Sequence, residues 1–312
     1  MGSIAAILLW PAMLSIRHIL VATDFCRMSL DSLRHALRIA LRYHSSVSML
    51  HVIDPAVYGL AGPDGIAAGC EKAQCELDCI EASLRRDGSL EGLKFDSMAR
   101  TGPVWTTIAD VIEEKCSALL VIGTRGRTGL GKLVLGSVAE SAFRESACPV
   151  LTFGPNVLQS KASGTDPKNF LVPTDLSAES LSALPYGVSL AKATGGDLTL
   201  LHVLPSRSAS NKDSVEAVSK METRLRAFLE LHPGTAKMAH FRVEAGPAAE
   251  VIVKVAERSQ MDVIVMGKRA WTTAGPPMWQ TAYKIVTQAS CPVVSIGAIE
   301  ALDPDVLTQA CA

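Results

Sequence analysis

Short apolar runs alternate along the chain with stretches whose apolar residues recur every three to four positions. In the first half the runs lie at 16–23, 47–53, 93–100, 118–123 and 149–153. Runs of this length, bounded by polar segments, predict buried strands. Between the first two runs, apolar residues follow the period of an amphipathic helix: Leu30, Leu33, Leu37, Ala40 and Leu41. The pattern therefore predicts strands and helices in alternation.

The second half of the chain repeats the first. Asp24 recurs 151 positions later as Asp175 inside the similar runs Leu-Val-Ala-Thr-Asp and Leu-Val-Pro-Thr-Asp, and His51 recurs at the same interval as His202. Gly123 recurs 144 positions later as Gly267. Intervals this constant predict two copies of one domain, the second shorter between its second and third strands.

We expect domains at 15–154 and 168–298, joined by a polar, turn-rich linker at 155–167, with an extension at 1–14 and a tail at 299–312. Alternating strands and helices predict an α/β fold, in which each copy is an open sheet of five mostly parallel strands with helices on both faces. Ligands of such sheets bind at the carboxyl ends of the strands. Pro185 and Gly187 are expected to interrupt the first helix of the second copy.

A glycine-rich segment, Gly123 to Ser137, follows the fourth strand of the first copy and contains Gly126, Gly129, Gly131 and Gly136. A strand, a glycine-rich loop and a helix N-terminus in this order can cradle a phosphate, because backbone N–H groups then face the anion. It is not a P-loop, since Lys132 is followed by leucine. The alternative is structural: Ser137 and Glu140 fit a capping box, which would start a helix without any ligand.

The segment 55–69 is rich in glycine and proline and reads as a loop, either a lid over a ligand or a passive connection. The helix expected after it, at about 67–87, carries Cys70, Cys75 and Cys79. These three thiols lack a nearby histidine and a C-x-x-C spacing, so we read them as ordinary free thiols rather than a metal or redox site.

The amino-acid composition disfavours two classes of binding partner, nucleic acids and membranes. The net charge is −1, which gives no long-range field for nucleic acid or an anionic membrane, and we expect neither partner. The apolar start, Met1 to Met13, is too short to span a bilayer and lacks the basic residues of a secretory signal, so we expect a cytoplasmic protein. Met13 is a second candidate for the start codon.

The spacing Gly-x2-Gly-x9-Gly-Ser resembles the nucleotide motif of the universal stress protein family, and the tandem copies resemble two domains of that family. The resemblance implies a Rossmann-like fold of the adenine nucleotide alpha hydrolase type and one bound ATP, with or without Mg2+. It implies that Asp24 lies near ribose and phosphate, and that Val52 offers backbone groups to adenine. It implies that the phosphates are held by Gly123, Gly126, Gly136, Ser137 and Val138.

The second copy departs from this motif. Gly126 is replaced by Ala270, and Gly136-Ser137 by Gln280-Thr281, while Pro276-Pro277 remove backbone donors. We therefore expect it not to bind ATP in the same manner.

The function that follows is a nucleotide-responsive stress or regulatory protein with one site in the first domain. We identify no catalytic residue and no metal site, so enzymatic activity is at most slow ATP hydrolysis. The alternatives are a weak ATPase and a structural module that binds no nucleotide. The last strands, 150–153 and 293–296, are expected to pair the two domains as an internal pseudo-dimer, and two chains to form a homodimer.

Overall fold

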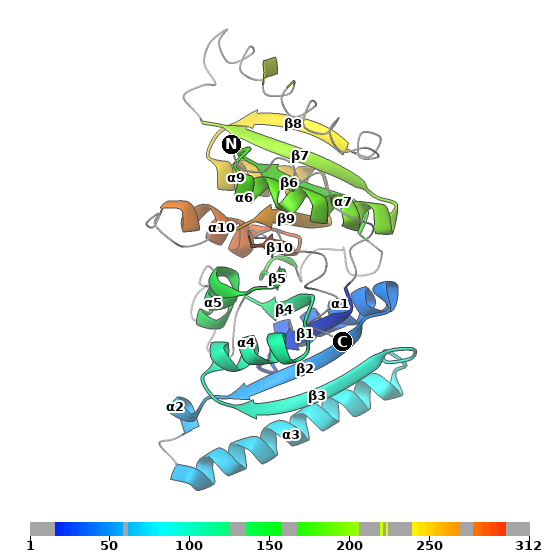
Figure 1. Ribbon diagram of the computed structural model, residues 1–312, viewed down its shortest axis with the longest axis vertical. Helices are drawn as coiled ribbons and strands as arrows, with labels where there is room; N and C mark the ends of the chain where they lie inside the picture. The colour runs from blue at the N-terminus through cyan, green and yellow to red at the C-terminus, as the bar shows by residue number, and fades with distance from the viewer. Residues whose placement is uncertain are drawn as a thin grey trace. The chain divides into compact units, whose positions relative to one another are not determined.

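The computed structural model describes residues 16–58, 62–124, 135–157, 167–205, 219–220, 223, 239–268 and 277–297. The chain divides into two compact units with a boundary between Phe153 and Gly154. Each is described by itself below (Figure 1).

The first domain contains five strands and five helices in its described part. The strands are β1 (His18–Ala22), β2 (Ser46–Ile53), β3 (Lys94–Thr101), β4 (Leu119–Gly123) and β5 (Val150–Phe153). The helices are α1 (Arg27–Tyr43), α2 (Pro55–Tyr58), α3 (Gly62–Arg86), α4 (Val104–Glu114) and α5 (Ser137–Glu145). The strands pair in the order β3-β2-β1-β4-β5, and every pair is parallel. This is a doubly wound sheet whose order reverses between β1 and β4.

The second domain repeats this topology. Its strands are β6 (Asn169–Thr174), β7 (Asp197–Leu204), β8 (Ala239–Ala245), β9 (Val263–Gly267) and β10 (Val293–Ile296), paired in the order β8-β7-β6-β9-β10. Its helices are α6 (Ala178–Leu181), α7 (Ala183–Thr194), α9 (Ala248–Arg258) and α10 (Pro277–Gln288). The predicted fold class, two repeated open parallel sheets with helices, is confirmed.

Apolar runs of the sequence form the central strands of the sheet, which make up the core of the domain. Residues 19–21 of β1 and 120–121 of β4 are fully buried, because helices cover both faces of the sheet. Right-handed crossovers place α1 and α3 on one face and α4 and α5 on the other. Helix α3 runs alongside β3, the outer strand of the domain, and packs on it and on β2 (Figure 1).

Two local expectations need correction. The segment 55–69 is mostly helical rather than a loop, because α2 starts at Pro55 and α3 already at Gly62. The first helix of the second domain is broken, but at Ser182 between α6 and α7, and not at Pro185 or Gly187. Pro185 lies in the first turn of α7, where the N–H that it lacks has no helical partner. Gly187 lies inside α7, where a β-carbon would collide with Val172.

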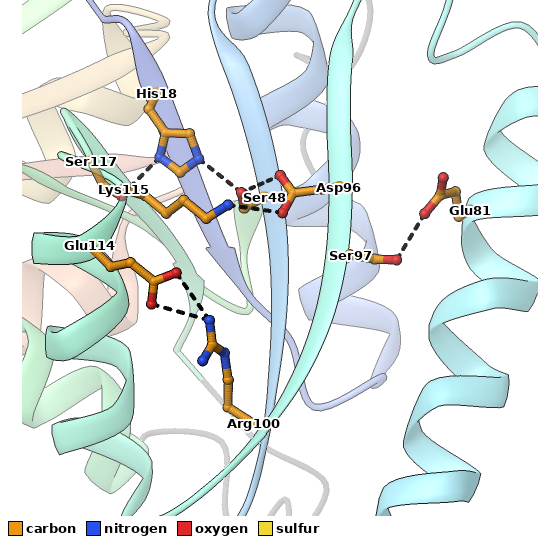
Figure 2. Close-up of polar contacts among 9 residues, drawn as sticks. All are labelled: His18, Ser48, Glu81, Asp96, Ser97, Arg100, Glu114, Lys115 and Ser117. Atoms are coloured by element: carbon orange, nitrogen blue, oxygen red, sulfur yellow. Dashed lines mark hydrogen bonds and ion pairs between the residues drawn. The ribbon is translucent and has the colours of Figure 1, made fainter. Parts of the chain in front are cut away.

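A polar network joins the amino ends of the strands in the first domain, with His18, Ser48 and Ser117 buried and Asp96 exposed (Figure 2). The His18 ring lies 2.9 Å from the hydroxyl of Ser117 through Nδ1 and 2.9 Å from that of Ser48 through Nε2. Ser48 donates to the Asp96 carboxylate at 2.5 Å, and Lys115 lies 3.3 Å from the other oxygen of Asp96. Burial lowers the pKa of His18 below its ordinary value, and Lys115 acts in the same direction, against the opposing effect of Asp96.

The protonation of this network follows from its partners. The Asp96 carboxylate only accepts, so the Ser48 proton points to it, and the Ser48 oxygen must accept from Nε2–H of His18. The neutral ring then accepts at Nδ1 from the Ser117 hydroxyl. A serine beside a histidine suggests a nucleophile, but Ser48 is fully buried, so no substrate reaches it. The network is structural.

No helix in the described part of the chain is both long enough and apolar enough to cross a membrane.

Candidate functional site

Six of the seven predicted binding residues lie at the carboxyl end of one sheet, where the strand order reverses. Asp24 follows β1, Val52 lies near the end of β2, and Gly123 ends β4. Gly136, Ser137 and Val138 form the start of α5. Gly126 falls in 125–134, outside the described residues. Because β1 pairs with both β2 and β4, the ends of these strands are neighbours.

Asp24 has one carboxylate oxygen engaged and one left over. Oδ1 accepts from the backbone N–H of Cys26 at 3.1 Å, which is the local turn that a structural role would require. Oδ2 is buried, and no described group hydrogen-bonds to it. Burial raises the pKa of Asp24, but hydrogen bonds from Cys26 and Ser29 outweigh it and hold the pKa below its usual value. The charged form thus presents an unpaired acceptor, which costs free energy unless a ligand binds it.

The turn after Asp24 is held in an uncommon conformation. Phe25 has φ of 64°, in the left-handed region that non-glycine residues rarely adopt, and Leu176 has φ of 63° at the same place in the second domain. The ring of Phe25 stacks on that of His51, with centroids 4.3 Å apart. His51 Nδ1 lies 2.8 Å from the carbonyl of Thr23, and His202 repeats this contact with Thr174. The repetition indicates that both histidines fix the strand end.

Val52 presents its backbone to the site. The carbonyl of Leu50 accepts from Thr23 on the β1 side, and that of Ile53 accepts from Gly102 on the β3 side. Backbone groups alternate in direction along a strand, so the N–H and C=O of Val52 point toward β1. Since β1 ends opposite Leu50, they meet no strand there. A donor nitrogen and an acceptor oxygen three bonds apart suit the edge of a purine ring.

A hydrogen bond joins the two ends of the glycine-rich segment. Gly136 N–H donates to the Thr124 carbonyl at 2.9 Å, and Thr124 is itself bound to the carbonyl of Phe153 through both N–H and hydroxyl. The sequence analysis missed Thr124, although a threonine following a buried strand was a visible signal. These bonds set Gly123 close to the start of α5.

The capping-box interpretation is wrong. The N-cap of α5 is Gly136, one residue earlier than expected, and no side chain caps the helix. Ser137 is consequently the first helical residue, so its hydroxyl is not placed to cap. The first N–H groups of a helix have no partner within it. Those of Ser137 and Val138 therefore face the strand ends with the positive end of the helix dipole.

The second domain differs at the equivalent glycine. Among the described residues, the atoms nearest to a β-carbon on Gly123 all belong to the flexible side chain of Met28, the first at 3.2 Å. A β-carbon on Gly267 would collide with the backbone carbonyl of Glu179, which belongs to α6. The backbone of α6 thus covers the end of β9, whereas the end of β4 is bordered by a side chain that can move.

The helix after the loop differs as well. Helix α10 begins at Pro277, so Thr281, the counterpart of Ser137, lies in its second turn. There the N–H of Thr281 pairs with the carbonyl of Pro277 and cannot serve an anion. The substitution at Ala270 lies outside the described residues.

Within the part of the first domain that the structure describes, three kinds of group without a hydrogen-bond partner lie at one edge: an anionic oxygen, a strand N–H and C=O, and helix N-terminal N–H groups. The arrangement can bind a molecule that carries a base, hydroxyls and an anionic group. Asp24 also fits Mg2+, which proteins bind through one or two carboxylates together with phosphate oxygens. The described residues contain no cluster of three or more metal-ligating side chains.

Comparison with known proteins agrees with the fold and the repeat. The model of the universal stress protein family matches residues 15–153 and again 167–296. A universal stress protein of Mycolicibacterium smegmatis is 25% identical over 297 residues, covering 89% of this chain and 96% of its own. Universal stress protein MJ0531 of Methanocaldococcus jannaschii is 29% identical over 136 residues, covering 43% of this chain and 80% of its own.

Among solved structures, a universal stress protein from Archaeoglobus fulgidus aligns with a TM-score of 0.66 at 23% identity, covering 91% of this chain and 100% of its own. That similarity supports the fold alone. The family match, which spans both halves of the chain, supports the assignment. The chain belongs to the universal stress protein family and carries two of its domains in tandem.

Proposed function

We propose that the first domain binds one adenine nucleotide, ATP with Mg2+, and that the protein is a nucleotide-responsive regulator in a stress response. The observation that carries this proposal is the buried Oδ2 of Asp24, which has no hydrogen-bond partner among the described residues and lies where the strand order reverses. Its desolvation has a cost that a bound ribose hydroxyl or metal ion would remove.

The other groups at this edge of the sheet would each bind a different part of the nucleotide. The backbone of Val52, past the end of β1, would bind the adenine edge. The N-terminus of α5, without a side-chain cap, would bind phosphate oxygens together with the glycine-rich segment. Asp24 lies between them and would bind ribose or the Mg2+ that accompanies the phosphates.

The second domain is proposed to bind no nucleotide in this manner. The carbonyl of Glu179 covers Gly267, and the helix start is displaced by one turn. The preserved site in one copy and the eroded site in the other argue against a purely structural use of the chain. We propose that binding fixes the segment from Gly123 to Ser137 and so changes the surface offered to a partner.

The test begins with protein purified without added nucleotide. Denaturation and mass spectrometry identify any released nucleotide and its stoichiometry, and calorimetric titration with MgATP measures binding to the emptied protein. We expect about one adenine nucleotide per chain. Asp24→Ala should weaken binding by about 10- to 100-fold, the effect of losing one or two charge-assisted hydrogen bonds.

Matched variants separate the two domains. Asp175→Ala changes the equivalent aspartate of the second domain and should leave binding intact, whereas Gly136→Gln installs the second domain's residue and should abolish it. Two nucleotides per chain would contradict the proposed loss in the second domain. No nucleotide, and no heat on titration, would favour the structural module.

The assembly is a further part of the proposal. The pairing of the two domains through their last strands, and a homodimer of chains, stay predictions from the sequence. Sedimentation equilibrium with and without MgATP would measure the mass of the assembly; a monomer at all concentrations would exclude the homodimer.

A further inference from the structure

Helix α3 carries a pair of thiols that its packing does not explain. The helix rests on the sheet through Ala73, Leu77 and Leu84, which are all buried. At 100° per residue, Cys75 and Cys79 lie on the opposite side of the helix. Both are exposed, and neither forms a hydrogen bond with a described residue. They therefore do not serve as small apolar core residues.

The spacing of the pair favours one kind of chemistry. Residues four apart on a helix have β-carbons about 5–6 Å apart, whereas a disulfide needs about 3.5–4.5 Å. An intact helix thus opposes a disulfide between them. Two metal–sulfur bonds of about 2.3 Å to one ion hold their sulfurs about 4–4.6 Å apart, which rotation about the side-chain bonds allows at this spacing.

The sequence alone favoured ordinary free thiols at these positions. From the exposure and spacing of the pair on α3 we propose instead that Cys75 and Cys79 form a two-coordinate site for a soft monovalent cation of the copper(I) class. Thiolates are the ligands that such ions prefer. A structural zinc site needs four ligands, and the described residues around the pair supply no third metal-ligating side chain. Binding one Cu+ releases one proton from each thiol and leaves the complex with one negative charge, with no change of oxidation state.

The site is independent of the nucleotide site, since α3 contributes no residue to the latter. Its test uses the full chain, reduced, desalted and kept free of oxygen. Cu+ is titrated in competition with a chromophoric copper(I) chelator, and the absorbance of the chelate reports the ion that the protein retains. We expect one Cu+ held per chain.

Two single variants and one spacing variant test the pair. Cys75→Ser and Cys79→Ser should each weaken binding by about 100-fold or more, because the second bond of a chelate gains from effective concentration. Cys79→Ser with Ala82→Cys keeps two exposed thiols on the helix but sets them about 10 Å apart along its axis, beyond the reach of one ion. It should bind no better than the single variants.

Cys116→Ser is the matched control, because Cys116 is an exposed thiol in the turn after α4, away from the pair on α3. It should retain the wild-type affinity. Binding that survives in the spacing variant, that falls equally in Cys116→Ser, or that needs two chains per ion would overturn the proposal. The variants change exposed side chains, and far-ultraviolet circular dichroism confirms that each is folded.

Discussion

At the scale of single residues, the charge state of His18 links the polar network to pH. Its pKa is lowered in the folded protein, so the unfolded chain binds the proton more tightly. Stability is then fully present above the unfolded pKa of about 6.5 and is lost as the pH falls toward the folded value. His18→Asn installs the residue that the second domain has there, Asn169.

We expect that His18→Asn reduces the slope of unfolding free energy against pH below about 6.5, measured by urea denaturation at several pH values. Some slope should remain, because burial and the nearby Arg38 also lower the pKa of His35. His44→Asn, at an exposed position with a left-handed backbone, is the control. A slope equal to that of the wild type would show that His18 does not contribute to the pH dependence of stability.

The two equivalent glycines make a second prediction. Gly267→Ala places a methyl group against the backbone of Glu179, which cannot rotate away, and should destabilise the second domain by about 3 kcal/mol or more. Gly123→Ala meets only the side chain of Met28 and should cost less than about 1.5 kcal/mol. Denaturant unfolding of both variants measures the difference; equal costs would show that α6 yields as easily as Met28.

At the scale of elements, the N-cap position of the first helix is occupied by different residues in the two domains. Cys26 caps α1 by accepting from the N–H of Ser29 at 3.4 Å. In the second domain the Ser177 hydroxyl accepts from Ser180 at 3.2 Å. Oxygen is the better acceptor, and serine is among the preferred N-cap residues.

Cys26→Ser should therefore raise the free energy of unfolding by about 0.5–1 kcal/mol, and Cys26→Ala should lower it. Thermal and urea unfolding of the two variants measure this pair of opposite shifts. A serine variant less stable than the wild type would show that the thiol packs in a way that a hydroxyl cannot replace.

The accuracy of the sequence-based predictions differs from one element to the next. The predicted strand at 47–53 is observed at Ser46–Ile53, where the buried residues impose their apolar pattern directly. The strand predicted at 93–100 is observed at Lys94–Thr101, but it is not buried as expected, because it is the outer strand of the domain. The N-cap predicted at Ser137 was misplaced by one residue, since Ser-x-x-Glu fits a capping box wherever it occurs. The N-cap is Gly136, whose N–H is bound to the Thr124 carbonyl. The network of His18 and Asp96 was not visible, because residues 78 positions apart meet only through strand register.

At the scale of the whole molecule, the second domain serves as an internal control for the candidate site of the first, because each site residue has an equivalent position there. Asp24 and Asp175 follow equivalent strands, yet Asp24 is half-buried and Asp175 is exposed. Sequence identity at this position therefore did not predict equal environments. Burial of a side chain depends on the elements packed around it, which a match between two short runs does not fix.

Binding should consequently stabilise one half of the chain. A ligand present at about 100 times its dissociation constant adds about 2.7 kcal/mol to the state that binds it. We expect MgATP to slow amide hydrogen exchange in the first domain at the ends of β1 and β2 and at the start of α5, and to leave the second domain unchanged. Mass spectrometry of peptic fragments measures both halves in one sample, and Asp24→Ala should abolish the protection. Protection of β6 and α10 as strong as that of β1 and α5 would instead mean that the second domain binds nucleotide by another geometry.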